Sequence, residues 1–127
     1  MGKKYLLDTN ILIYIEKGIS DKKVLAFLTE ATINGTIISI MTAIEVLGFN
    51  FASLADQQKM ELLVADCAVL PLNSLVAQHT IAIRKKHKIK LPDAIIAATA
   101  LANNCVLVSC NISDFNFIDD LVVVNPF

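Results

Sequence analysis

Near its N-terminus the chain reads Tyr5-Leu6-Leu7-Asp8-Thr9-Asn10-Ile11-Leu12-Ile13. An apolar run meets a short polar segment and then resumes, a pattern typical of a buried strand, a turn and a helix. This interpretation places the carboxylate of Asp8 at the carboxyl end of the first strand. Ligands bind at that edge in open α/β sheets. Further acidic residues that reach the same edge would therefore form a site with Asp8.

The rest of the chain alternates between short strand-like and helix-like segments. Strands are expected at residues 36–40, 68–70, 105–109 and 121–124, and helices at 11–16, 21–33, 42–50, 56–65, 74–86 and 94–102. Ser20 and Ser74 are expected to cap two of these helices. The alternation is typical of parallel βαβ units with helices on both faces of the sheet. We therefore expect a single α/β domain over residues 1–127, an α/β/α sandwich around a mostly parallel sheet of about five short strands.

Composition excludes several classes of protein. Hydrophobic residues make up 55% of the chain and charged residues 18%, yet no apolar run approaches the ~20 residues that span a bilayer. No signal peptide is expected, because Asp8 interrupts the first apolar run. The apolar excess then predicts helices and a sheet buried on most sides, together with an oligomer interface. The net charge of −1 does not by itself indicate a nucleic-acid binder.

The cysteines give a weaker indication of location. The chain has three, Cys67, Cys105 and Cys110, and no CxxC pair. An odd number without such a pair argues against a disulfide framework or a zinc ribbon. Free thiols are typical of the reducing cytoplasm, so a cytoplasmic protein is expected.

Carboxylates with apolar surroundings are the unusual feature of the sequence, and there are four of them: Asp8, Glu45, Asp93 and Asp114. Each has a purely structural explanation. Asp8 can cap the helix that follows it, and Thr42 and Glu45 have the spacing of a capping box. Asp93 lies in a first helical turn, where the helix dipole favours negative charge. Asp114 can belong to a short capped turn.

Taken together, the acids predict a metal site. Asp8, Glu45 and Asp114 each follow an expected strand, so a parallel sheet gathers them at its carboxyl edge. Crowded carboxylates raise one another's pKa and cost stability unless a cation compensates them. Oxygen ligands without a Cys or His cluster suit Mg²⁺ or Mn²⁺ rather than Zn²⁺. Hydrolysis of a phosphodiester by metal-activated water is the chemistry that such a site supports.

Motifs along the whole chain resemble those of PIN-domain nucleases, most closely the VapC-type toxins of bacterial and archaeal toxin–antitoxin pairs. The resemblance is carried by Leu7-Asp8-Thr9-Asn10-Ile11-Leu12, by Glu45 within its helix, by Leu91-Pro92-Asp93-Ala94-Ile95-Ile96-Ala97-Ala98 and by Val108-Ser109-Cys110-Asn111-Ile112-Ser113-Asp114-Phe115. It implies a Rossmann-like α/β/α fold, a Mg²⁺- or Mn²⁺-dependent endoribonuclease, a homodimer and a cognate antitoxin protein.

The resemblance also implies roles for individual residues. Asp8 and Asp93 would be the main metal ligands, Glu45 would bind metal or orient the attacking water, and Asp114 would complete the acidic cluster. Support would come from Thr9, Asn10, Ser109 and Asn111. Two of these depart from the commoner family pattern. Ser109 stands where threonine is more frequent, and Asn111 stands where some relatives have aspartate, which would weaken a second metal site.

A basic segment precedes Asp93. Arg84, Lys85, Lys86, Lys88 and Lys90 are five of the chain's 11 Lys and Arg residues. Cations at a helix end suit the C-terminal dipole. The functional alternative is a strip of phosphate contacts that guides RNA to the acids, in which Arg84, Lys85 and Lys88 take part.

Other residues have less specific interpretations. His79 lies on an apolar helix face and is expected to be a core or interface histidine rather than a catalytic base. Tyr14, Phe49 and Phe51 favour core packing, with a groove for an antitoxin helix as the alternative.

Two functions compete with the nuclease. A PIN-like fold can serve as a non-catalytic nucleic-acid-binding or RNA-processing protein that is not a toxin, although four acids facing phosphate disfavour binding alone. Asp8 can also be read as an aspartyl nucleophile for phosphotransfer. That chemistry usually has a second acid two residues on, where this chain has Asn10.

Overall fold

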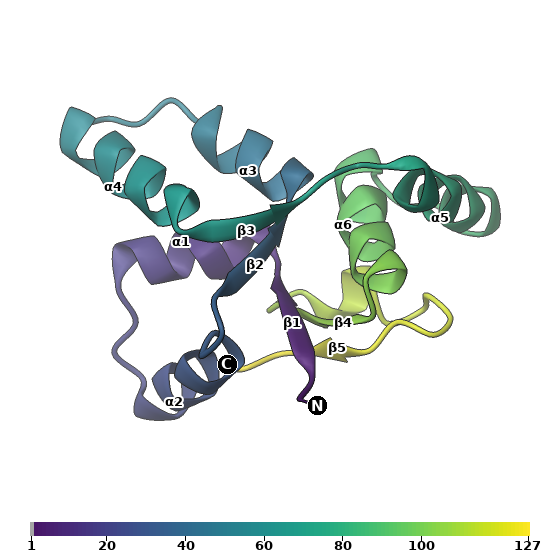
Figure 1. Ribbon diagram of the computed structural model, residues 1–127, viewed down its shortest axis with the longest axis horizontal. Helices are drawn as coiled ribbons and strands as arrows, with labels where there is room; N and C mark the ends of the chain where they lie inside the picture. Colours follow the sequence, from purple (N-terminus) through teal and green to yellow (C-terminus); the bar gives the residue numbers. More distant parts are fainter. Residues whose placement is uncertain (1) are drawn as a thin grey trace.

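The computed structural model describes residues 2–127. Its strands are β1 (Lys4–Leu7), β2 (Thr36–Ser39), β3 (Cys67–Leu70), β4 (Cys105–Val108) and β5 (Val123–Val124). Its helices are α1 (Thr9–Lys17), α2 (Lys22–Ala31), α3 (Ile40–Leu47), α4 (Leu54–Ala65), α5 (Ser74–Lys86) and α6 (Leu91–Ala102), and a 3₁₀ turn, η1, covers Ile112–Asp114. Figure 1 shows these elements along the chain.

The sheet has five strands in the order β3-β2-β1-β4-β5, and every neighbouring pair is parallel. The predicted α/β fold is therefore confirmed, with a sheet that is wholly rather than mostly parallel. Lys4 lies opposite Cys105 and Leu7 opposite Val108, so β1 and β4 end at the same level. The chain leaves β1 toward β2 on one side and returns to β4 on the other. This arrangement creates a topological switch point beside β1, where open α/β sheets bind ligands.

Helices cover both faces of the sheet, as Figure 1 shows, with α1 to α4 on one side and α5 and α6 on the other. Successive strand residues point to opposite faces. Leu6 and Leu107 accordingly belong to the core beneath α5 and α6, whereas Leu7 and Val108 belong to the core beneath α1 to α4. All four side chains are 0% exposed, which explains why β1 and β4 are apolar on both faces.

Most of helix α6 is buried. Ala94 to Ala100 are seven consecutive buried residues. Alanine predominates among them, and its small side chain allows α5 and the sheet to approach the helix closely. Pro92 lies in the first turn, where a missing N–H costs nothing. Within residues 2–127 no helix is both long enough and apolar enough to cross a membrane.

Several predicted helix starts are wrong, and the capping side chains explain why. Helix α3 begins at Ile40 because the Ser39 hydroxyl accepts a hydrogen bond from the Met41 N–H at 3.0 Å. Asp21, not Ser20, caps α2, and Asn73, not Ser74, caps α5. Asp and Asn are as good N-caps as Ser, so the capping residue of each of these two helices was assigned one position too early or too late.

The segment after β4 is anchored in the core by aromatic and aliphatic side chains. Phe115 is 1% exposed and Ile118 is 5% exposed, and both pack into the core beneath α5 and α6. On the surface, Lys86 Nζ of α5 lies 2.6 Å from the Asp119 carboxylate. Exposed pairs of this kind stabilise little. Burial of Phe115 therefore holds this segment, which carries Asp114, against the sheet.

We predict that Phe115→Ala lowers the free energy of unfolding by about 3–5 kcal/mol, because it leaves a cavity in a closed core. Urea denaturation followed by circular dichroism measures the change. Phe117→Ala is the matched control, since Phe117 lies in the same segment and is 38% exposed; it should cost about 1 kcal/mol or less. Equal losses in the two variants would contradict the assignment of Phe115 as the anchor.

Candidate active site

Asp8 occupies the centre of the site, directly after β1. Its backbone N–H donates to the Val108 carbonyl at 2.9 Å, which continues the β1–β4 pairing by one residue. The side chain is 5% exposed. One carboxylate oxygen, Oδ1, accepts from the Thr9 N–H at 2.8 Å, and the other, Oδ2, accepts from the Ser109 hydroxyl at 2.8 Å. Asp8 is thus the N-cap of α1, and it also joins the ends of two central strands.

Ser109 follows β4 and is completely buried. Its hydroxyl donates a hydrogen bond to Asp8, and its oxygen accepts one from the Asn111 N–H at 3.0 Å. The second contact orders the turn that leads into η1. Ser109 therefore holds the Asp8 carboxylate on one side and begins the segment that carries Asp114 on the other.

Glu45 reaches the site from the exposed side of α3. Its Oε1 accepts from the Thr9 hydroxyl at 2.7 Å, and the Thr9 and Thr42 hydroxyl oxygens are 3.0 Å apart. The expected capping box of Thr42 and Glu45 is wrong, because α3 begins before Thr42 and Ser39 provides the cap. Glu45 is directed across to α1 instead.

Asp93 lies in the first turn of α6 and is half-buried. Burial raises its pKa above the ordinary value, and the charges of Asp8, Asp114 and Glu45 raise this pKa further, while Lys90 lowers it. Burial likewise raises the pKa of Asp8, although its hydrogen bonds from Ser109 and Thr9 counteract the effect. Mutual repulsion of this kind requires short separations. The charges of the other three acids therefore act on Asp93, and Asp8, Glu45 and Asp114 follow β1, β2 and β4 at the carboxyl edge of the sheet.

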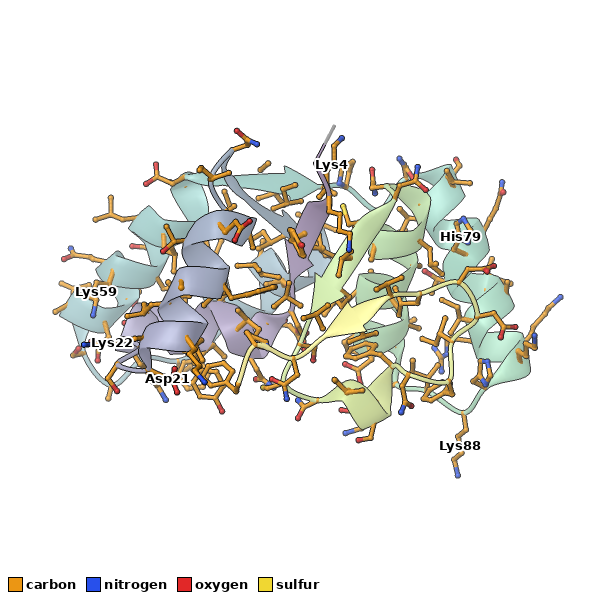
Figure 2. The ribbon with its side chains drawn as sticks, turned by 90° about the horizontal axis from the view of Figure 1, so that it is seen from below. Lys4, Asp21, Lys22, Lys59, His79 and Lys88 are labelled. Atoms are coloured by element: carbon orange, nitrogen blue, oxygen red, sulfur yellow. The ribbon has the colours of Figure 1, made fainter. Side chains whose placement is uncertain are left out.

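Thr9 and Ser109, two of the residues predicted to support the site, bond directly to its acids. The side chains of the other predicted support residues make no hydrogen bond to the acids within residues 2–127. Asn10 and Asn111 are exposed next to Thr9 and Cys110 in the chain, and Arg84 and Lys85 are exposed in the last turn of α5. Lys88 follows that turn, and Figure 2 shows its side chain extending away from the body of the molecule. No contact joins Arg84, Lys85 or Lys88 to an acid of the site within residues 2–127. Lys90, the residue before α6, is the nearby cation that acts on Asp93.

Thr42 is the residue of this site that sequence reasoning assigned incorrectly. It is 0% exposed and bonds to Thr9, whereas its spacing from Glu45 had suggested only a cap. A usable signal existed, because residues three apart on a helix lie on the same face. This spacing places Thr42 and Glu45 on one face of α3, where both contact Thr9.

The donor set fits a hard divalent cation. The charge of Asp8 raises the pKa of Asp93, and within residues 2–127 no Lys, Arg or His forms an ion pair with any of the four acids. No group of three or more His, Cys, Asp or Glu side chains in this range is arranged to hold a metal ion. Mg²⁺ commonly takes only one or two protein carboxylates and completes its shell with water and phosphate oxygens. Asp8 and Asp93 can provide that number.

The family model of the PIN domain matches residues 5–119 of the chain. The chain belongs to the PIN domain family. PIN domains are typically metal-dependent nucleases, and the matched region contains the four acids described above. A search of curated protein sequences gave no significant match.

Solved structures of toxin–antitoxin complexes share this PIN fold. A toxin–antitoxin complex from Klebsiella pneumoniae is 30% identical, with 98% of each chain covered and a TM-score of 0.77. VapBC-1 from nontypeable Haemophilus influenzae is 29% identical over 96% of this chain and 97% of that chain, with a TM-score of 0.77. VapBC2 from Rickettsia felis, crystallised with a DNA fragment from its promoter, is 24% identical over 95% and 97% of the two chains, with a TM-score of 0.81. The last likeness shows the fold alone.

We predict that Asp93→Asn stabilises the metal-free protein at neutral pH. The folded-state pKa of Asp93 is raised above its ordinary value of 3.8. The folded protein therefore binds more protons than the unfolded chain between these two pKa values, so the free energy of unfolding falls as pH rises through this window and stays lower above it. The amide removes this contribution, and the advantage of the variant should shrink as the pH falls toward about 4.

Urea denaturation in EDTA, at a series of pH values, measures the difference between Asp93→Asn and the wild type. Asp119→Asn is the control of opposite sign, because Lys86 lowers the pKa of Asp119; this variant should not gain stability at neutral pH. Identical pH profiles for the wild type and Asp93→Asn would contradict the crowding of carboxylates.

Proposed function

We propose that residues 1–127 form a single PIN domain that acts as a Mg²⁺- or Mn²⁺-dependent endoribonuclease, the toxin of a VapBC-type pair. The supporting observation is that Asp8, Glu45 and Asp114 act electrostatically on Asp93, while none of the four acids forms an ion pair within residues 2–127. Membership of the PIN family and the 30% identity to a toxin–antitoxin complex favour this function.

In this proposal Asp8 and Asp93 hold the metal, and Glu45 and Asp114 complete the acidic cluster. When bound, Mg²⁺ or Mn²⁺ supplies positive charge for the phosphate and lowers the pKa of water. The hydrogen bonds from Thr9 and Ser109 fix the orientation of the Asp8 carboxylate. The second carboxylate oxygen of Glu45 is free of the Thr9 bond. That oxygen would orient the attacking water and accept its proton.

RNA would reach this site over the basic segment. Arg84, Lys85 and Lys88 are exposed, and none is engaged in an ion pair within residues 2–127. Contacts from such side chains to phosphates add salt-dependent affinity and little sequence preference. Lys86 is less suited to this role because it pairs with Asp119.

We expect purified protein with Mg²⁺ or Mn²⁺ to cleave single-stranded or structured RNA, and EDTA to abolish the cleavage. Asp8→Ala should reduce the rate by at least about a thousand-fold, because it removes a metal ligand and the Thr9 and Ser109 contacts. Gel electrophoresis of labelled RNA measures the rate. Asp21→Ala is the matched control, since Asp21 is also an N-cap aspartate but belongs to α2, away from the acids; it should cleave normally.

Intact RNA after incubation of antitoxin-free protein with either metal would contradict the nuclease. If RNA then bound equally well in EDTA and with metal, a non-catalytic RNA-binding role would replace it. A nuclease whose expression leaves growth unaffected would instead fit an RNA-processing protein that is not a toxin.

The antitoxin would bind a groove next to Glu45. This cavity of about 510 Å³ is lined by α1, α3 and α4 and includes Glu45, Val46, Phe49, Phe51 and Met60. The Phe49 and Phe51 rings pack edge to face with centroids 5.0 Å apart, and Phe49 is 64% exposed. Lys59 and Glu16 pair at 3.9 Å on its rim; Figure 2 shows where Lys59 lies.

An exposed aromatic pair in a mixed apolar and charged groove suits one face of an amphipathic helix. The third aromatic residue considered for this groove, Tyr14, lies elsewhere. Its ring packs against Phe127 with centroids 5.2 Å apart. Only two of the three aromatic residues considered from the sequence therefore line the groove, and Phe49 is the more exposed of the two.

We predict that Phe49→Asp prevents co-purification with the antitoxin encoded by a reading frame adjoining this gene, and that co-expression of that antitoxin relieves growth arrest by the wild type but not by the variant. Leu62→Asp is the control, because Leu62 is a 71% exposed apolar residue of α4 outside the groove. Retention of the antitoxin by Phe49→Asp would contradict the groove as its binding site.

A homodimer is also expected. Several large apolar side chains are exposed on α5 and at the start of α6, among them Leu75, Ile81 and Leu91. Apolar surface of this kind favours association of two chains. Which of these side chains meet in the dimer depends on the symmetry of the pair.

A further inference from the structure

Two hydroxyl groups and one carboxylate form a row of hydrogen bonds from the core to the surface of the site. Thr42 is 0% exposed in α3, Thr9 is half-buried at the start of α1, and Glu45 is exposed. The Thr42 and Thr9 hydroxyl oxygens are 3.0 Å apart, and Thr9 Oγ1 is 2.7 Å from Glu45 Oε1. These contacts connect buried Thr42 of α3 to exposed Glu45 of the same helix through Thr9 of α1.

The direction of the protons in this row of hydrogen bonds follows from chemistry. An ionised carboxylate only accepts hydrogen bonds, so the Thr9 hydroxyl must donate its single proton to Glu45. The Thr9 oxygen can then only accept from Thr42. Thr42 is therefore the donor at the buried end, and Thr9 has one hydroxyl orientation that satisfies both neighbours.

Thr42 uses its hydroxyl unlike the other buried threonines. Thr80 donates to the Val76 carbonyl at 2.8 Å, and Thr99 donates to the Ile95 carbonyl at 2.7 Å, in each case four residues earlier in the same helix. The bond of Thr80 satisfies a buried hydroxyl within its own helix. Thr99 Oγ1 also lies 3.4 Å from the Ser39 hydroxyl oxygen, a longer contact than its bond to Ile95. Thr42 instead directs its hydroxyl across the interface between α3 and α1.

We propose that Thr42 is a positioning residue, whose buried hydroxyl fixes the Thr9 side chain and through it the Glu45 carboxylate, a role whose kinetic consequence rests on the nuclease function proposed above. Glu45 is a long, exposed side chain with several rotamers. Thr9 restrains it at one oxygen only, and Thr9 is itself restrained by Thr42. Without the Thr42 donor, the Thr9 hydroxyl loses its fixed orientation and Glu45 gains alternative positions.

Thr42→Val preserves the shape and burial of the side chain and removes only the donor. We expect kcat for RNA cleavage to fall about ten-fold with KM unchanged. The variant weakens the hydrogen bond from Thr9 to the Glu45 carboxylate, and Glu45 acts in the chemical step rather than in substrate binding. Thr42→Ser should restore kcat to within about two-fold of the wild type. Thr9→Val should lower kcat as far as the double variant Thr9→Val/Thr42→Val, because both act through one row of hydrogen bonds.

A second measurement needs neither RNA nor metal. Three-bond couplings from the Thr9 methyl carbon, recorded by NMR on the full metal-free chain, report the Thr9 χ1 rotamer. We expect one rotamer in the wild type and Thr42→Ser, and rotamer averaging in Thr42→Val. Thr80→Val is the matched control: it also removes a buried threonine hydroxyl, from α5, and it should leave both kcat and the Thr9 couplings unchanged.

An unchanged kcat together with a single Thr9 rotamer in Thr42→Val would overturn the positioning role. Equal losses in Thr42→Ser and Thr42→Val would assign the effect to packing and would overturn it as well. If the wild type cleaves no RNA, the nuclease proposal fails, whereas the Thr9 couplings still decide whether Thr42 fixes Thr9. Should Thr42→Val not fold, Thr42→Cys fills the position with a weak donor and carries the same expected losses.

Discussion

The buried carboxylate of Asp8 joins the two central strands of the sheet where they end. Its N–H continues the pairing of β1 with β4, one oxygen begins α1, and the other receives the hydroxyl proton of Ser109. Ser109 in turn orders the turn toward Asp114. A single side chain at 5% exposure thus determines where α1 starts and how β4 continues. The remaining acids are positioned around it by elements that begin at the same edge of the sheet.

The side chains of Asp8 and Glu45 accept hydrogen bonds from neutral donors, and this has a chemical consequence. Thr9 and Ser109 give hydrogen bonds to Asp8 and Glu45 without cancelling their charge. A lysine or arginine in the same positions would place a positive charge beside the carboxylates and compete with a cation for their oxygens. Burial of the uncompensated charge, together with repulsion from the neighbouring acids, raises the pKa values of Asp8 and Asp93. In the proposed nuclease, this arrangement would favour binding of a cation over stability of the metal-free protein.

Much of the fold, and the edge of the sheet at which the predicted acids lie, could be predicted from periodicity and strand ends. The alternation of apolar runs predicted the parallel sheet, and the carboxylates that follow strands predicted where Asp8, Glu45 and Asp114 gather. The order of the strands could not be predicted, because it depends on tertiary packing rather than on local pattern. For the same reason, the position of Asp93 beside Asp8 followed only from family resemblance. Asp93 does not follow a strand, and its helix reaches the site because β4 returns beside β1.

The errors in the sequence interpretation concern polar side chains for which the local sequence allows more than one hydrogen-bond partner or cap position. Ser20 and Ser74 were adjacent to equally good caps, and one-residue choices of this kind depend on backbone geometry. Thr42 and Glu45 had the spacing of a capping box, which is a local arrangement, yet each bonds to Thr9 of another helix. Local rules assign a polar side chain to its own helix whenever the spacing permits. They fail where two helices start at the same sheet edge, because there a neighbouring helix offers a partner that the spacing does not reveal.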